Sequence, residues 1–184
     1  MARARDLEAL GAEYRVKHNG FLPDRVRRSG RKERRKAMQA LGDGCGWLAR
    51  LAMAGDNLRF FTVSLDAFNL EHLQNESSLY DHDAINSIKH ATLEAMPGAF
   101  WARLEVGKYE RKLHVHILAH DAPRVAYASR KVESLERVAA YVSKCPVPGG
   151  DQSAGIFLEA QKRARESGRK RLPRTSFRRG IPNS

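Results

Sequence analysis

Short runs of apolar, β-branched and aromatic residues mark the middle of the chain as a set of β-strands. Such runs cover residues 58–65, 99–106 and 112–119. Their length, and the turn residues that bound them, favour strands over helices. Residues 107–111 separate the last two runs and predict a hairpin turn with a two-residue tip at 109–110. The pattern therefore predicts antiparallel pairing of the last two strands.

Helical spacing of apolar residues occurs on both sides of this hairpin. Asp81 is placed to cap a helix that runs to Met96, and a later helix is predicted from Ser134. Residues 124–128 predict a short strand, and residues 155–166 a last helix followed by a poorly structured basic tail. The sum is an α+β fold, with a central antiparallel β-sheet flanked by helices.

Two histidines lie inside the strand predicted at 112–119. Side chains alternate between the faces of a strand, so His114 and His116 project to the same side and can share a metal ion. With the predicted turn, Glu105 lies directly across from His114 and offers a carboxylate as a third ligand. His120 has the same parity and is an alternative ligand, unless it only marks the end of the strand. The bland alternative is two core histidines, with Glu105 paired to a neighbouring cation.

The helix predicted after Ser134 carries a second candidate group. Tyr141 and Lys144 are three residues apart and therefore share a helix face. A tyrosine hydroxyl can act as a nucleophile, and a nearby ammonium group can stabilise the phenolate. Metal ligands and a tyrosine nucleophile together are the parts needed to cut a phosphodiester and to keep one end covalently attached. Taken alone, each of the two residues is more often structural.

The order of these motifs resembles that of the HUH endonucleases (His-hydrophobe-His), and specifically of single-tyrosine replication initiators of plasmids and phages. The apolar strand at 60–65 comes first, the pair His114 and His116 second, and the motif Tyr141 to Lys144 last. The resemblance implies a ferredoxin/RRM-like sheet with both histidines on its middle strand. The mixed nitrogen and oxygen ligand set suits Mn²⁺ or Mg²⁺ as cofactor, and zinc is less expected without a cysteine ligand.

That resemblance implies an activity as well. Tyr141 would attack a phosphorus atom of single-stranded DNA, leaving a 5′-phosphotyrosyl link and a free 3′-OH, with Lys144 assisting both cutting and joining. The chain would thereby nick and rejoin a specific DNA strand and initiate rolling-circle replication. The expected partner is single-stranded or hairpin origin DNA. A separate helicase is also expected, because the sequence contains no phosphate-binding glycine-lysine motif.

The distribution of charge supports a nucleic-acid partner. The net charge is +12, yet residues 41–161 hold 12 Lys or Arg against 15 Asp or Glu, so the positive excess lies at the two ends. Lys and Arg on DNA phosphates release counterions, which favours binding. The expected organisation is a basic helical segment at 1–57, an endonuclease core at 58–161 and a basic tail at 162–184. The expected DNA contacts are Arg25, Arg27, Arg28, Arg31, Arg34, Arg35, Arg169, Lys170, Arg171, Arg174, Arg178 and Arg179.

Other features of the sequence argue against a membrane protein and a secreted protein. No apolar run approaches the length of a membrane span, and the charged start does not resemble a secretion signal. Only Cys45 and Cys145 are present, which is typical of free thiols in a reducing cytoplasm. Oligomeric state is left open. Tyr109, Trp101 and Phe100 are candidate stacking faces for DNA bases, although core packing is preferred for Phe100.

Three alternatives compete with a replication initiator. The nearest is a single-tyrosine HUH transposase, which shares the chemistry but usually has its tyrosine farther after the histidines. The second is a non-catalytic nucleic-acid-binding module in which the histidines are fortuitous. The third is a metal-dependent β-barrel enzyme, which would need a glutamate shortly after His116, where the chain has Ile-Leu-Ala-His-Asp.

Overall fold

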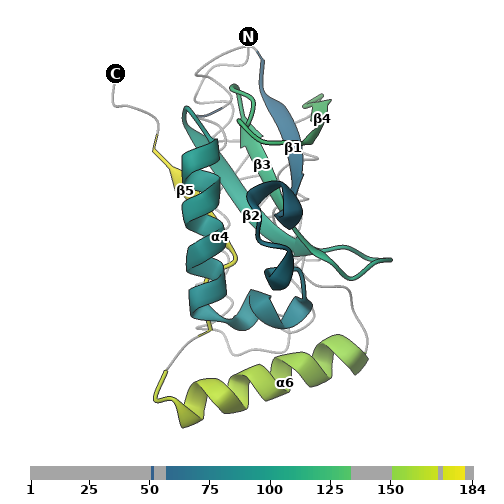
Figure 1. Ribbon diagram of the computed structural model, residues 1–184, viewed down its shortest axis with the longest axis vertical. Helices are drawn as coiled ribbons and strands as arrows, with labels where there is room; N and C mark the ends of the chain where they lie inside the picture. Colours follow the sequence, from purple (N-terminus) through teal and green to yellow (C-terminus); the bar gives the residue numbers. More distant parts are fainter. Residues whose placement is uncertain (1–50, 52–56, 134–150, 170–171, 181–184) are drawn as a thin grey trace, which may run out of the picture. The chain divides into compact units, whose positions relative to one another are not determined.

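The computed structural model describes residue 51 and residues 57–133, 151–169 and 172–180 (Figure 1). The chain divides into two compact units. One consists of Met1–Leu58 with Lys131–Cys145, and lies almost entirely outside the described residues. The other consists of Arg59–Arg130 with Pro146–Ser184, and contains the sheet.

The second unit is built on a five-stranded antiparallel sheet, as the α+β prediction requires. Its strand order is β4-β1-β3-β2-β5, so β3 is the central strand (Figure 1). In chain order the elements are β1 (Arg59–Ser64), η1 (Leu65–Phe68), η2 (Glu71–Leu73), η3 (Glu76–Tyr80), α4 (His82–Ala95), β2 (Phe100–Val106), β3 (Leu113–Ala119), β4 (Ala128–Lys131), α6 (Asp151–Glu166) and β5 (Ser176–Arg179).

The three strongest predicted strands are confirmed as β1, β2 and β3, with ends that differ by one residue at most. Two other expectations were wrong. The short strand expected at 124–128 instead starts at Ala128, as β4. The basic tail was expected to be poorly structured, yet Ser176–Arg179 pairs with β2 as an edge strand. Phe177 supplies the apolar contact there, because its ring lies edge-on to Phe100 at 6.3 Å.

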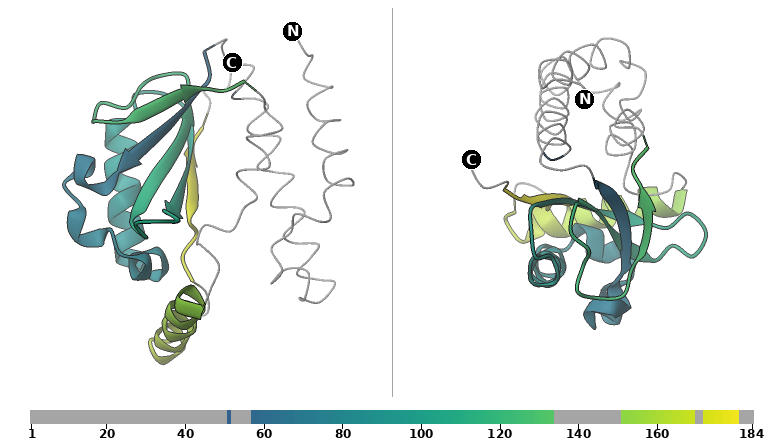
Figure 2. Two further views of the ribbon diagram at one scale, coloured as in Figure 1. Left: turned by 90° about the vertical axis from the view of Figure 1, so that its right-hand side faces the viewer. Right: turned by 90° about the horizontal axis from the view of Figure 1, so that it is seen from above.

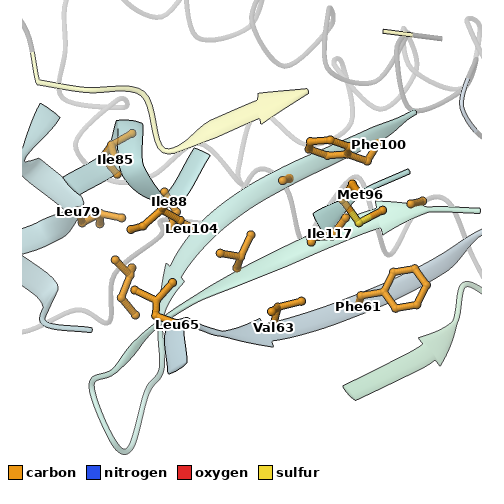
Figure 3. Packing of buried hydrophobic residues seen from close by; sticks show 14 of the residues in the cluster. Phe61, Val63, Leu65, Leu79, Ile85, Ile88, Met96, Phe100, Leu104 and Ile117 are labelled. Atoms are coloured by element: carbon orange, nitrogen blue, oxygen red, sulfur yellow. The ribbon is translucent and has the colours of Figure 1, made fainter. Parts of the chain in front are cut away.

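One face of the sheet carries the hydrophobic core (Figure 3). Alternate residues of the three inner strands point into it, since successive strand side chains face opposite sides. Helix α4 lies along this face (Figure 2). The fully buried members of the core include Phe61, Val63, Leu65, Ile88, Phe100, Ala102, Leu104, Val115, Ile117 and Ala119.

Helix α4 begins where the sequence predicts. One carboxylate oxygen of Asp81 accepts from the backbone N–H groups of Asp83 at 2.7 Å and Ala84 at 3.2 Å. These are two of the donors that a helix start otherwise leaves without partners. The predicted apolar face is buried except for Leu93, which is partly exposed. Thr92 fits there because its hydroxyl donates to the Ile88 carbonyl at 2.8 Å.

Three short 3₁₀ helices, absent from the sequence prediction, connect β1 to α4. They include Glu76, whose buried carboxylate forms an ion pair with Arg111 of the β2–β3 hairpin. The same connection accepts a backbone hydrogen bond from Leu113, because the carbonyl of Gln74 lies 2.7 Å from its nitrogen. These two contacts with the 3₁₀ connection therefore stabilise the hairpin that leads into β3.

The turn of this hairpin is longer than predicted. The N–H of Gly107 donates to the carbonyl of Lys112 at 2.9 Å, which encloses a four-residue loop. Arg111 ends the loop with a φ of 53°, in the left-handed region. A four-residue loop centred on the same point as a two-residue tip leaves the pairing unchanged, so the predicted facing of residues 105 and 114 is confirmed.

Helix α6 packs on the 3₁₀ connection through Tyr80 and Phe157, whose ring centroids lie 5.7 Å apart. The last predicted helix is thus present, and it starts earlier than expected, at Asp151. Within the described residues, no helix is both long and apolar enough to cross a membrane.

Candidate functional site

Both histidines lie on the central strand and project from the face opposite the hydrophobic core. Their neighbours Leu113, Val115 and Ile117 all belong to the core, so strand alternation places His114 and His116 on the other side. The two rings meet edge-on, with centroids 4.5 Å apart. Their Nε2 atoms are 2.8 Å apart. The expected convergence of the two imidazoles is therefore present.

Polar side chains surround the histidines on the neighbouring strands. In the ladder, His114 pairs with Ser64 of β1 on one side and with Glu105 of β2 on the other. His116 pairs in the same way with Thr62 and Arg103. Directly paired residues share a face, so two polar rows cross the three inner strands.

Glu105 reaches toward the second histidine. Its Oε2 atom lies 3.8 Å from Nε2 of His116, and the two side chains are 15% and 8% exposed. The carboxylate on β2 and the two imidazoles on β3 thus approach one another, with Glu105 and His116 largely shielded from water and His114 partly exposed. This is the ligand set expected from the sequence, and its role in binding stays a prediction.

The donors can be compared with the geometry that a divalent ion requires. Ligand atoms about 2.1 Å from one ion lie about 3.0–3.4 Å apart, for octahedral to tetrahedral angles. The 2.8 Å and 3.8 Å separations at His116 fall just outside this range on either side. As they stand, no three or more His, Cys, Asp or Glu side chains among the described residues form a group that could hold a metal ion. To hold one ion, the two Nε2 atoms would separate slightly and Glu105 would move closer.

The other ring nitrogens of the histidines also have partners. Nδ1 of His114 lies 3.3 Å from the carbonyl oxygen of Lys112, and Nδ1 of His116 lies 3.1 Å from the hydroxyl of Thr62. The ring of Phe60 lies against His116, with centroids 4.9 Å apart, and the guanidinium of Arg130 lies 5.2 Å from the Phe60 centroid. These contacts fix the plane in which the His116 ring lies.

A charged carboxylate also lies at the end of β1. The hydroxyl of Ser64 hydrogen-bonds to Asp66 and is the main cause that lowers the pKa of that carboxyl below its ordinary value. Asp66 therefore stays ionised at neutral pH, two residues beyond the strand position that faces His114. An ionised carboxylate therefore lies near this end of the site, as does Lys112, whose positive charge also lowers the pKa of Asp66.

The remaining predicted site residues are placed only in part. Tyr141 and Lys144 lie outside the described residues, as do Cys45 and Cys145. His120 follows the end of β3. Four residues of a strand span about 13 Å, which is too far for His120 to share an ion with His116.

The predicted DNA-binding cations are also placed only in part. Six of them at residues 25–35, and Lys170 and Arg171, lie outside the described residues. Arg169, Arg174 and Arg178 are described and exposed. Arg179 has a structural role, because its guanidinium donates to the carbonyls of Leu93 and Met96 at the end of α4.

Of the three candidate stacking residues, only one is available to a ligand. Phe100 and Trp101 are 0% and 8% exposed, and Phe100 is in the core as preferred. Tyr109 is 89% exposed at the hairpin tip, with the ammonium of Lys108 5.5 Å from its ring centroid. The hairpin starts beside the histidines: a Cβ atom on Gly107 would lie 3.7 Å from Cε1 of His114.

Two residues near the histidines are not among those predicted from the sequence: Thr62 contacts His116, and Arg130 lies over the Phe60 ring. Thr62 lies on β1 and Arg130 on β4. The sequences of these two strands do not reveal that β1 pairs with β3 and that β4 pairs with β1. The only available signal was the polar residue within the apolar run of β1. Comparison with known proteins adds no assignment, because no family model, curated protein or solved structure matches this chain.

Proposed function

We propose that this chain is a metal-dependent DNA nicking and joining enzyme of the HUH type, acting as a rolling-circle replication initiator. One observation carries the proposal. The Nε2 atoms of His114 and His116 converge to 2.8 Å on the central strand, on the face turned away from the core. The order of motifs along the chain is the second support.

In the proposed reaction, the tyrosine hydroxyl oxygen of Tyr141 attacks the phosphorus of the scissile phosphate. The new Oη–P bond replaces the P–O3′ bond, and the departing 3′ oxygen takes up a proton equivalent to the one lost by the phenol. The number of phosphodiester bonds is conserved, so attack by a 3′-OH on the phosphotyrosine rejoins the strand. Lys144 stabilises the phenolate, whose ordinary pKa of about 10 disfavours it at neutral pH.

The described residues supply the binding part of this reaction. His114, His116 and Glu105 would hold a divalent cation, which when bound neutralises charge on a non-bridging phosphate oxygen. Arg130 and the exposed arginines of the C-terminal segment would contact the DNA backbone, giving affinity without sequence information. Exposed Tyr109 would stack on an unpaired base.

The test uses single-stranded oligonucleotides that tile both strands of the DNA encoding and flanking the gene. Each is labelled at its 3′ end, because a 5′-phosphotyrosyl link retains that fragment on the protein. The expected result is a labelled band that requires Mn²⁺, survives denaturation and disappears after protease treatment. It should be lost in Tyr141→Phe and retained in Tyr109→Phe, the matched control at an exposed tyrosine.

A specific observation favours one other function, a non-catalytic nucleic-acid-binding module. The described residues hold no complete three-donor metal group, and a hydrogen bond between two imidazoles also explains the 2.8 Å contact. Under this alternative, oligonucleotides bind but no covalent band forms, with or without Mn²⁺. The same gel therefore separates the two functions.

A further inference from the structure

The hydrogen-bond partners of the two imidazoles determine where their protons lie. The carbonyl oxygen of Lys112 can only accept, so Nδ1 of His114 donates to it across 3.3 Å. A neutral His114 ring then has its lone pair on Nε2. The 2.8 Å contact between the Nε2 atoms needs one hydrogen, and with both rings neutral His116 supplies it. His114 is therefore ready to bind a cation, whereas His116 carries a proton at the atom that would bind it.

The other nitrogen of His116 faces a group that can reverse its role. With Nε2 protonated, Nδ1 of His116 is an acceptor, and the hydroxyl of Thr62 donates to it across 3.1 Å. For Nε2 to bind a cation, the ring must lose the proton there and gain one at Nδ1, so it stays neutral. The hydroxyl then rotates and accepts from Nδ1. A threonine hydroxyl can do both, because it holds one donor and two lone pairs.

We propose that Thr62 is a positioning residue that lets His116 change tautomer and present Nε2 to a divalent cation. This inference rests on the proposed function, because it concerns the same site. Thr62 faces His116 directly in the β1–β3 ladder, and its β-branched side chain has few rotamers. The ring of Phe60 covers one side of the His116 ring, with centroids 4.9 Å apart. This contact and the Thr62 hydroxyl together keep the His116 ring in place while its proton moves from Nε2 to Nδ1. Partners behind metal-bound histidines commonly act in this way.

The experiment measures Mn²⁺ binding by isothermal titration calorimetry on the full chain without DNA. Thr62→Val keeps the shape and removes the hydroxyl, and Thr62→Ser keeps the hydroxyl. The valine variant is expected to bind Mn²⁺ 10- to 100-fold more weakly, and the serine variant within about threefold of wild type. Thr92→Val makes the same substitution in α4, at the core face away from the histidines, and is the matched control that should bind as wild type.

A second measurement reports the tautomer directly. Imidazole ¹⁵N chemical shifts of the cation-free protein should identify Nδ1 of His116 as the unprotonated nitrogen in wild type. Addition of diamagnetic Mg²⁺ should reverse the assignment in wild type and in Thr62→Ser. In Thr62→Val the reversal should require a higher Mg²⁺ concentration. If Thr62 acted through packing alone, Thr62→Val would show the same reversal as wild type at the same Mg²⁺ concentration.

The outcomes separate this inference from the proposed function. If wild type binds Mn²⁺ and Thr62→Val binds it equally well, the role of Thr62 is wrong and the proposed function stands. If Thr62→Ser is as weak as Thr62→Val, the hydroxyl is not the cause and the inference is again overturned. If wild type binds neither Mn²⁺ nor Mg²⁺, the metal-dependent function fails, and the role of Thr62 fails with it.

Discussion

Replacing Glu105 with glutamine is expected to weaken Mn²⁺ binding while leaving the fold intact. The carboxylate of Glu105 is the donor nearest to the imidazole pair on β2, with Oε2 3.8 Å from Nε2 of His116. Glutamine has nearly the same shape and keeps one carbonyl oxygen, so the substitution removes the charge without opening a cavity. Because only 15% of the Glu105 side chain is exposed in the folded protein, most of its desolvation cost belongs to folding rather than to metal binding.

The size of the effect follows from the distance. A unit negative charge about 4 Å from a divalent ion gains about 2 kcal/mol in water, where Coulomb attraction is weakest. This corresponds to about a 30-fold change in the dissociation constant. The surroundings of Glu105 have a lower effective dielectric constant than water, and direct ligation shortens the distance. Desolvation of the ion and the movement of Glu105 oppose these gains, so the expected weakening is about 30-fold.

Calorimetric titration with Mn²⁺ measures this effect, and Glu110→Gln provides the matched control. Glu110 lies on the same hairpin and loses the same charge, but its side chain is 77% exposed and it pairs only loosely with Lys112, at 3.9 Å. Solvent and salt screen such a charge, so the control should stay within about twofold of wild type. Equal affinities for wild type and Glu105→Gln would refute the assignment of Glu105 as a ligand, provided that His116→Ala abolishes binding.

Three further predictions concern the fold and the DNA contacts. Asp81→Ala should lower the free energy of unfolding by about 1 kcal/mol in urea titration, and Asp81→Asn by less, because the cap of α4 is lost only in alanine; equal effects would contradict the cap. Arg179→Ala should destabilise the protein by about 1.5–3 kcal/mol through its lost hydrogen bonds to α4, whereas exposed Arg178→Ala should not. The reverse order in thermal unfolding would exclude that role. Tyr109→Ala should weaken binding of a single-stranded oligonucleotide by about 1–3 kcal/mol in fluorescence anisotropy, and Tyr109→Trp should not, since stacking needs only an aromatic face.

The sheet could be predicted well where apolar alternation was strong. The strands β1, β2 and β3 are bounded by turn residues, so their limits follow from the sequence. The four-residue loop in place of a two-residue tip did not change the predicted strand pairing, because both keep residue 105 opposite residue 114. The segments that failed carry weaker signals. The 3₁₀ helices at 65–80 have no regular period, and β5 was missed because Phe177 is its only apolar residue and two of its four residues are arginines.

The site could be predicted only as far as local spacing reaches. The shared face of His114 and His116 follows from a period of two, and Glu105 follows from a neighbouring hairpin strand. Thr62 lies 54 residues before His116 in the chain, so its contact depends on the order of strands in the sheet. Nothing in a single segment specifies that order. The partner that holds the second histidine therefore becomes visible only in the folded sheet.

The position of the polar rows in the sheet weighs against a purely structural role for the histidines. The middle of the central strand is where a polar side chain loses most contact with water, and His116 is 6% exposed. Burial of polar groups costs free energy unless every one of them is hydrogen-bonded, and an apolar pair at 114 and 116 would avoid that cost. Here the polar residues extend across three strands and include a carboxylate beside two imidazoles. Local departures from an apolar pattern of this kind concentrate at functional sites, which is why metal binding at this pair is the property to measure before any other.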